Sequence, residues 1–157
     1  MFSEAEQIVI EEKLEQLRKI KDGTLSPQEL ANLITKRRVS WFEENRDWLL
    51  RKYSGLPDEE KVWRIICFDY MKINPADSRI TRVSSNKIRL DSYNFCPYLE
   101  ACKELGLDTR YVCKEIGEPS IQIICKMINP KLVFSRNYQN IRPHNLDFCE
   151  EYFEVLK

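Results

Sequence analysis

The stretch SRITRVSSNKIRLDSY, residues 78–93, decides the class of fold that this chain adopts. Its centre is a polar turn at residues 84–86. Apolar residues stand among polar ones on both sides of that turn: Ile80, Val83, Ile88 and Leu90. Two short mixed runs around a polar turn are typical of a β-hairpin. The stretch therefore predicts that strands begin here.

The residues before this hairpin predict helices. Apolar residues recur at near-helical spacing in residues 3–21, and Gly23 ends the pattern. Ser26 has the position of an N-cap, with Pro27 at the first helical position. We expect this second helix to run to about Arg38. A third and a fourth helix are expected over residues 39–54 and 56–73, separated by Gly55.

Helix and strand patterns alternate after the hairpin. Helices are expected from Pro97 to Gly106 and again after Asp108, with an interruption at Gly117 and Pro119. Two further strands are expected over residues 131–139 and 146–155. The fold class is therefore α+β: N-terminal helices, then an antiparallel sheet of about four strands, in two hairpins, packed with helices. We expect a single domain over residues 1–157, helical over residues 1–73 and α+β over residues 74–157.

A short internal similarity supports two helix-plus-hairpin units. IICFDYMKINP, residues 65–75, resembles IICKMINP, residues 123–130, and each is followed by a hairpin pattern and then Phe-Cys. Chance similarity is the alternative, because matches of a few residues are common.

The bulk composition limits the function. Lys plus Arg and Asp plus Glu both number 25, so the formal net charge is zero, and 43% of the residues are hydrophobic. This balance gives no reason to expect nucleic acid or anionic lipid as a partner. The N-terminus is too charged for a signal peptide or a membrane span. We expect a cytoplasmic protein whose six cysteines are reduced.

The cysteines differ in their expected roles. Cys67, Cys102 and Cys125 stand among apolar helical neighbours, which indicates core packing. Cys96 precedes Pro97 and therefore has the position of an N-cap. The positive end of the helix dipole would stabilise a thiolate there, so Cys96 is a candidate nucleophile or metal ligand. An ordinary capping thiol is the alternative.

Other candidate ligands lie in the C-terminal half. Cys113 falls in the next helix, Cys149 in the last strand and His144 in the loop before it. If these converge on Cys96, they form a zinc-type metal site (Cys96, Cys113 and Cys149) or a thiol with a base. A solvated surface histidine is the alternative for His144.

The C-terminal half resembles the L-2-amino-thiazoline-4-carboxylate hydrolase-like family, and is similar in motif order to vinyl-reductase-type small-molecule-binding domains. The segments that carry the resemblance are CPYLEACKELGL, YVCKEIGE, INPKLVFSRNYQ and LDFCEEYFE. It covers residues 90–155 and implies a compact α+β domain that holds a small ligand, with thiols near the pocket. It implies hydrolysis at a C–N or amidine-like bond.

Roles for such a reaction follow from side-chain chemistry. Cys96 is the candidate nucleophile, and His144 or Glu115 is the candidate proton donor. Arg136 is the candidate that holds a substrate carboxylate, with an ordinary ion pair as its alternative.

The sequence raises two other classes of function: a non-catalytic binding domain and a nucleic-acid-binding protein. A non-catalytic sensor domain that binds a small ligand or a metal in a cysteine-lined pocket is the alternative to the enzyme. The basic run TKRRVSW, residues 35–41, is interpreted as a solvated face between two helices and not as a nucleic-acid site. The apolar residues of the N-terminal helices pack either into the core of the domain or in the interface of a homodimer.

Overall fold

The structure, a computed structural model, describes residues 1–145 and 147–157. It confirms the α+β class, with N-terminal helices that precede an antiparallel sheet. The helical segments are α1 (Glu4–Lys21), α2 (Pro27–Lys52), α3 (Asp58–Arg64), η1 (Ile65–Tyr70), η2 (Pro75–Asp77), α4 (Pro97–Leu105), α5 (Thr109–Val112), η3 (Cys113–Gly117) and α6 (Glu118–Ile128). The strands are β1 (Ser78–Ser84), β2 (Lys87–Ser92), β3 (Leu132–Arg136) and β4 (Cys149–Val155).

Local capping explains where the first two helices begin. The backbone N–H of Glu29 donates to Oγ of Ser26 at 3.0 Å, which confirms Ser26 as the N-cap of α2. At the start of α1, Ser3 and Glu6 form a reciprocal capping box. Between the two helices, Gly23 adopts a left-handed φ of 81°, a conformation that favours glycine.

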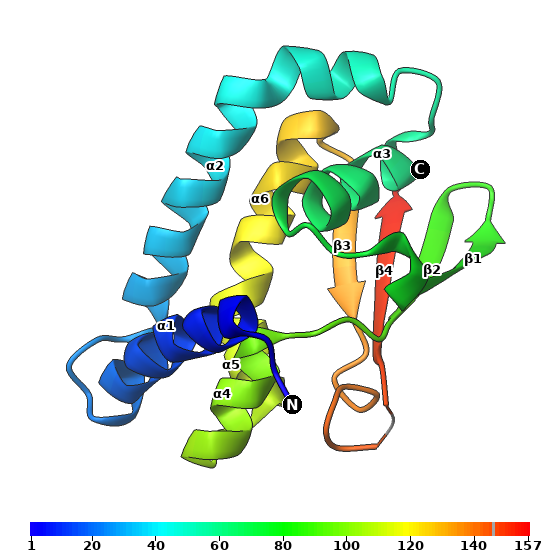
Figure 1. The fold of residues 1–157 in the computed structure, drawn as a ribbon. Coiled ribbons are helices and arrows are strands. Elements are labelled where there is room, and N and C mark those ends of the chain that lie inside the picture. The colour runs from blue at the N-terminus through cyan, green and yellow to red at the C-terminus, as the bar shows by residue number, and fades with distance from the viewer. Residues whose placement is uncertain (146) are drawn as a thin grey trace.

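The prediction of two helices over residues 27–54 is wrong, because α2 is one continuous helix from Pro27 to Lys52. No glycine or proline interrupts the sequence between Pro27 and Lys52. Figure 1 shows α2 running along one side of the molecule, with its C-terminal part curving over the top towards α3. Arg38 therefore lies inside a helix and not in a connection between two helices.

The sheet has the order β1-β2-β4-β3, with every neighbouring pair antiparallel. It consists of the two predicted hairpins, joined through their inner partners β2 and β4. In Figure 1, α6 lies between α2 and the sheet. A helical segment precedes each hairpin, as the internal similarity suggests, but Phe95-Cys96 follows the first hairpin whereas Cys149 begins β4 within the second. The duplication itself stays a prediction.

The row of side chains that faces the helices changes character along the sheet. Phe134 on β3 pairs with Phe153 on β4, and both are buried. Two residues further along each strand, the pair is Arg136 with Glu151. Because successive side chains alternate between the two faces, these pairs lie on the same face. The sheet is thus apolar under α3 and α6 and charged at its other end.

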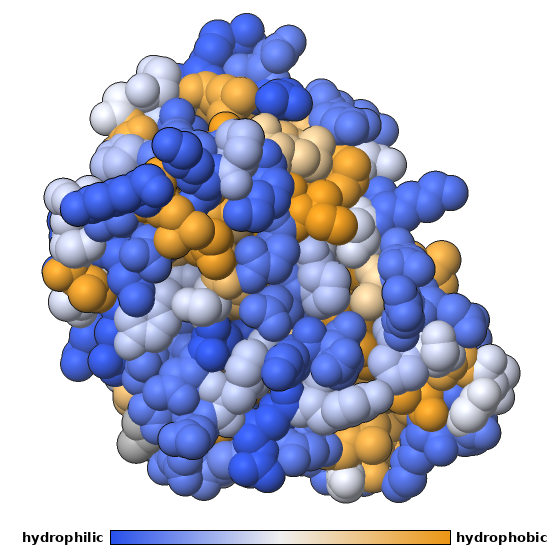
Figure 2. Space-filling view, turned by 180° about the vertical axis from the view of Figure 1, so that it is seen from behind, coloured by the Kyte–Doolittle hydropathy of each residue, from blue (hydrophilic) through white to orange (hydrophobic). Residues whose placement is uncertain are grey.

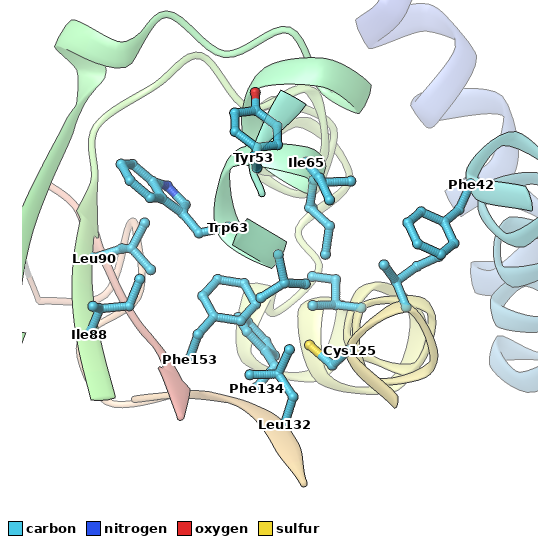
Figure 3. Packing of buried hydrophobic residues seen from close by; sticks show 14 of the residues in the cluster. Phe42, Tyr53, Trp63, Ile65, Ile88, Leu90, Cys125, Leu132, Phe134 and Phe153 are labelled. Atoms are coloured by element: carbon cyan, nitrogen blue, oxygen red, sulfur yellow. The ribbon is translucent and has the colours of Figure 1, made fainter. Parts of the chain in front are cut away.

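Two hydrophobic clusters hold the fold together. The first, called the sheet cluster, includes Phe42, Leu49, Ile65, Ile124 and Phe153. Figure 3 shows its side chains converging from α2, α3, α6 and the sheet. The second, called the N-terminal cluster, joins α1, the first half of α2, α4 and η3 through Leu14, Leu30, Ile34, Cys102 and Ile116. Helix α2 contributes to both clusters.

Three cysteines are expected in the hydrophobic core, and two of them are fully buried there. Cys102 and Cys125 are buried in the N-terminal and sheet clusters, and Cys67 packs against the sheet cluster. Burial raises the pKa of Cys102 and of Cys125 to about 12, so both thiols stay protonated at neutral pH.

One face of the molecule carries no continuous apolar area among the described residues. The face seen from behind is mainly hydrophilic, with hydrophobic residues in small separate groups (Figure 2). None of the helices in the described residues combines the length and the hydrophobicity needed to cross a bilayer.

The continuity of α2 is tested by an alanine–glycine comparison at Ser40, an exposed position near the middle of the helix. Ser40→Gly is expected to be less stable than Ser40→Ala by about 1 kcal/mol, because glycine loses more conformational entropy in a helix interior. Denaturant unfolding measures the difference. The same pair at Asn32, which is helical in both interpretations, is the reference. Equal stabilities at residue 40 would contradict a continuous helix.

Candidate ligand-binding groove

A groove of about 570 Å³ lies between α1, α2, the segment after η1 and the start of α4. Its lining comes from four stretches of the chain: Ala5, Glu6, Val9 and Lys13; Ile34, Arg37 and Arg38; residues 70–73; and residues 94–98. A volume of this size is typical of small-molecule sites. The groove is therefore the first candidate for a functional site.

The groove continues inwards into a smaller cavity of about 90 Å³, called the inner cavity. Four residues line both spaces: Arg38, Met71, Cys96 and Tyr98. Val112, Cys113, Gly117, Ile121 and Arg136 complete the inner cavity. The inner cavity thus lies where α2, η3 and the charged end of the sheet meet the start of α4.

Both π-helical segments border these spaces. The segment η1 ends at Tyr70, which lines the groove, and η3 contains Cys113 and Gly117, which line the inner cavity. Pro119 follows η3 and has no backbone N–H, so a regular α-helical ladder is incomplete there. Single π-helical turns in longer helices are frequent at functional sites.

Arg38 is the central polar side chain of the groove. Its Nη1 donates to Oγ of Ser120 at 2.9 Å, and its guanidinium carbon lies 5.2 Å from the centre of the Tyr70 ring. Its Nε is buried and has no hydrogen-bond partner among the described residues. The partners that Arg38 does have are uncharged, so its positive charge is not neutralised by a carboxylate of the described chain.

Lys13 and Arg37 add positive charge to the lining of the groove. Lys13 and Arg37 both lie near Glu12, at 3.9 and 3.7 Å between charged atoms. Burial is the main cause that lowers the pKa of Lys13; Arg37 and Arg38 lower it further, against an opposing effect of Glu12. Glu6 is the one carboxylate among the described lining residues, and it caps α1.

Arg136 forms the ion pair that was one of its two expected roles; its role in holding a substrate carboxylate stays a prediction. It lines the inner cavity, and its Nη2 donates to Glu151 at 3.0 Å. Only 11% of its side chain is exposed. Its Nε, like that of Arg38, is buried without a hydrogen-bond partner in the described chain. Arg136 is therefore a buried, neutralised cation with one free donor.

The structure confirms Cys96 as the N-cap of α4, with Pro97 at the first helical position. The surroundings of Cys96 disfavour the expected thiolate. Burial raises the pKa of Cys96, and this effect outweighs the backbone N–H of Leu99 and the nearby charge of Arg142, which lower it. A helix N-terminus favours a thiolate only where the thiol keeps contact with water or with a strong positive charge.

Cys113 and Cys149 lie near Cys96 but form a different environment from the one expected. Cys113 lines the inner cavity, and burial raises its pKa to about 12. Cys149 accepts a hydrogen bond from Nε of Arg142 at 3.4 Å. Arg142 also donates to the backbone oxygen of Asn94 at 2.8 Å. Arg142 thereby connects the last strand to the segment before α4.

His144 and Glu115 do not join the cysteines. Nε2 of His144 lies 2.9 Å from Oδ1 of Asp108, the N-cap of α5. The hydrogen bonds of Arg110 are the first cause that lowers the pKa of Asp108 to about 2, and His144 adds to it. Glu115 is exposed on η3, whereas Cys113 of the same segment lines the inner cavity. The expected pairing of His144 or Glu115 with Cys96 is not seen.

The geometry of the expected metal ligands does not form a metal site. Among the residues that the structure describes, no group of three or more His, Cys, Asp or Glu side chains is arranged to hold a metal ion. Cys96, Cys113 and Cys149 are neighbours without that arrangement.

Sequence reasoning missed Arg38. It placed the basic run at residues 35–41 on a solvated face between two helices. Lys36 and Arg37 are exposed as expected, but the helix is continuous there and Arg38 lines the groove and the inner cavity. A signal was present: Arg38 follows the buried Ile34 by one helical turn, and Phe42 follows Arg38 by another. An arginine in register with two core residues indicates a side chain that faces the interior.

A comparison of the chain with protein-family models, with curated proteins and with solved structures finds no match. The resemblance to the aminothiazoline carboxylate hydrolase-like family therefore stays a prediction.

The raised pKa of the cavity thiols predicts slow alkylation. In the native protein at pH 8, Cys96 and Cys113 are expected to react with iodoacetamide more slowly than free cysteine, because only the thiolate reacts. Their rates should rise with pH without a plateau up to pH 9. Mass spectrometry of labelled peptides gives each rate, with the core residue Cys102 as a slow reference. If Cys96 reacts faster than free cysteine, it is ionised in the native protein, and the raised pKa is wrong.

Proposed function

We propose that this chain is a small-molecule-binding domain and that its ligand occupies the groove between α1, α2 and the start of α4. The observation that carries the proposal is the groove itself, about 570 Å³ in volume and continuous with an inner cavity. Its lining combines apolar side chains, such as Val9, Ile34 and Phe95, with a few polar groups. This combination is typical of sites that bind organic molecules.

Binding without catalysis is supported better than thiol catalysis. A nucleophilic cysteine needs a lowered pKa or an adjacent base. The pKa of Cys96 is raised, and His144 pairs with Asp108. The location we include in the proposal is the cytoplasm, which fits six cysteines that are all free. A homodimer through the N-terminal helices stays a prediction.

Hydrolysis of an aminothiazoline carboxylate is the second proposal. It is supported by Cys96, which lines both the groove and the inner cavity, and by the resemblance of residues 90–155. The test is turnover of aminothiazoline carboxylate by the purified protein and by Cys96→Ser. Turnover that is lost in Cys96→Ser supports the hydrolase. Absence of turnover in the wild type rejects it.

Binding in the groove is tested with three probes of one shape and different charge: phenylacetate, phenylacetamide and phenethylamine. At least one of them is expected to shift the backbone amide NMR signals of groove residues in a saturable way. Val9→Trp is expected to weaken that binding by about tenfold or more, because an indole fills space between α1 and α2. Ile8→Trp is the matched control, since Ile8 is 64% exposed on the same helix.

Two outcomes would reject the groove as the site. In one, none of the probes shifts the signals of the groove residues at concentrations up to their solubility. In the other, Val9→Trp and Ile8→Trp have the same effect on affinity, which places binding elsewhere on α1. Circular dichroism of both variants confirms that the helices are retained.

A further inference from the structure

We propose that the inner cavity binds the carboxylate of an organic monoanion, with Arg38 as the residue that recognises the charge. The inference rests on the proposed function and deepens it, because it names the class of ligand and the end of the ligand that enters first. It is carried by the position of Arg38, by its free donor and by the charge balance around it.

Two arginines that line this cavity each have a donor that is unpaired among the described residues. Nε of Arg38 and Nε of Arg136 are both buried without a hydrogen-bond partner in the described chain, and both residues line the inner cavity. Buried donors are almost always paired in folded proteins, since an unpaired one loses its hydrogen bonds to water. Two unpaired donors on one small cavity indicate that an acceptor belongs there.

The charges around the cavity do not balance. The guanidinium of Arg136 is neutralised by Glu151, 3.0 Å away. The guanidinium of Arg38 has the hydroxyl of Ser120 and the ring of Tyr70 as its partners, and no carboxylate of the described residues pairs with it. One partly buried positive charge is thus left over, and a single negative charge on the ligand balances it.

The charge balance and the size of the cavity separate a carboxylate from a phosphate. The single unneutralised guanidinium of Arg38 matches the single charge of a carboxylate, whereas a phosphate brings more oxygens and more charge than this small cavity can satisfy. The remaining walls are formed by apolar side chains such as Val112 and Ile121 and by two thiols that stay protonated. The inner cavity is also small, at about 90 Å³.

The outer lining indicates what the rest of the ligand is. From the inner cavity the path outwards runs along Met71 and Tyr98, which line both spaces, and then along Phe95 and Ile34. These side chains offer apolar and aromatic contact and no further buried charge. The body of the ligand is therefore hydrocarbon or aromatic, and the cationic side chains of the groove lining favour the approach of an anion.

The test compares phenylacetate with its neutral amide, phenylacetamide, in amide NMR titrations of the full chain. In the wild type, phenylacetate is expected to bind about tenfold more tightly or better. Arg38→Met is expected to remove this preference, and Arg38→Lys to retain some of it, because lysine keeps the charge but not the Nε donor. Lys36→Met is the matched control: it removes one exposed charge from the same helix and is expected to leave the preference unchanged.

The outcomes distinguish this inference from the proposed function. If phenylacetamide or phenethylamine binds the groove as tightly as phenylacetate, the carboxylate site is wrong while the binding groove stands. If Lys36→Met lowers the preference as much as Arg38→Met, the effect is general electrostatics and the inference is overturned. If inorganic phosphate displaces phenylacetate at equal concentration, the site is a general anion site and the carboxylate assignment fails. The wild-type comparison decides the question even if Arg38→Met does not fold.

Discussion

The relative placement of the two hydrophobic clusters and of the groove depends on one constraint. Helix α2 is a single helix whose side chains pack in both clusters. Leu30 and Ile34 bind it to the N-terminal cluster, and Phe42 and Leu49 bind it to the sheet cluster. Since a helix is stiff, the two clusters are held at a fixed separation along its length. Arg38 lies between the two sets of anchors, and the groove lies beside it.

The same burial that stabilises the fold changes the chemistry of its cysteines. Cys96 has the capping position that favours a thiolate, but packing by the surrounding segments reduces its contact with water and raises its pKa. A guanidinium keeps its charge under the same conditions, because its pKa is far above neutrality. The polar chemistry of the groove therefore comes from Arg38 and Arg136, and the thiols act as apolar lining.

Local signals predicted most of the fold. The caps at Ser26 and Cys96 and the turn at residues 84–86 were readable because they depend on neighbours in sequence. The continuity of α2 and the partner of His144 were not, because each is decided by contacts between distant segments. For the candidate site, Cys96, Cys113 and Arg136 line the inner cavity, but the roles expected of them stay predictions. Arg38 was missed because its role depends on α1 and η3 packing around it.

The most direct measurement is the side-chain Nε–H NMR signal of Arg38, assigned by its loss in Arg38→Lys. We predict that this signal moves downfield in a saturable way when phenylacetate is added, because the free donor gains a charged acceptor. The Nε–H signal of Arg51, which is exposed on the same helix and does not line the groove, serves as the internal reference and is expected to move little. An Arg38 signal that stays unchanged while phenylacetate saturates the groove would contradict recognition of the carboxylate by Arg38.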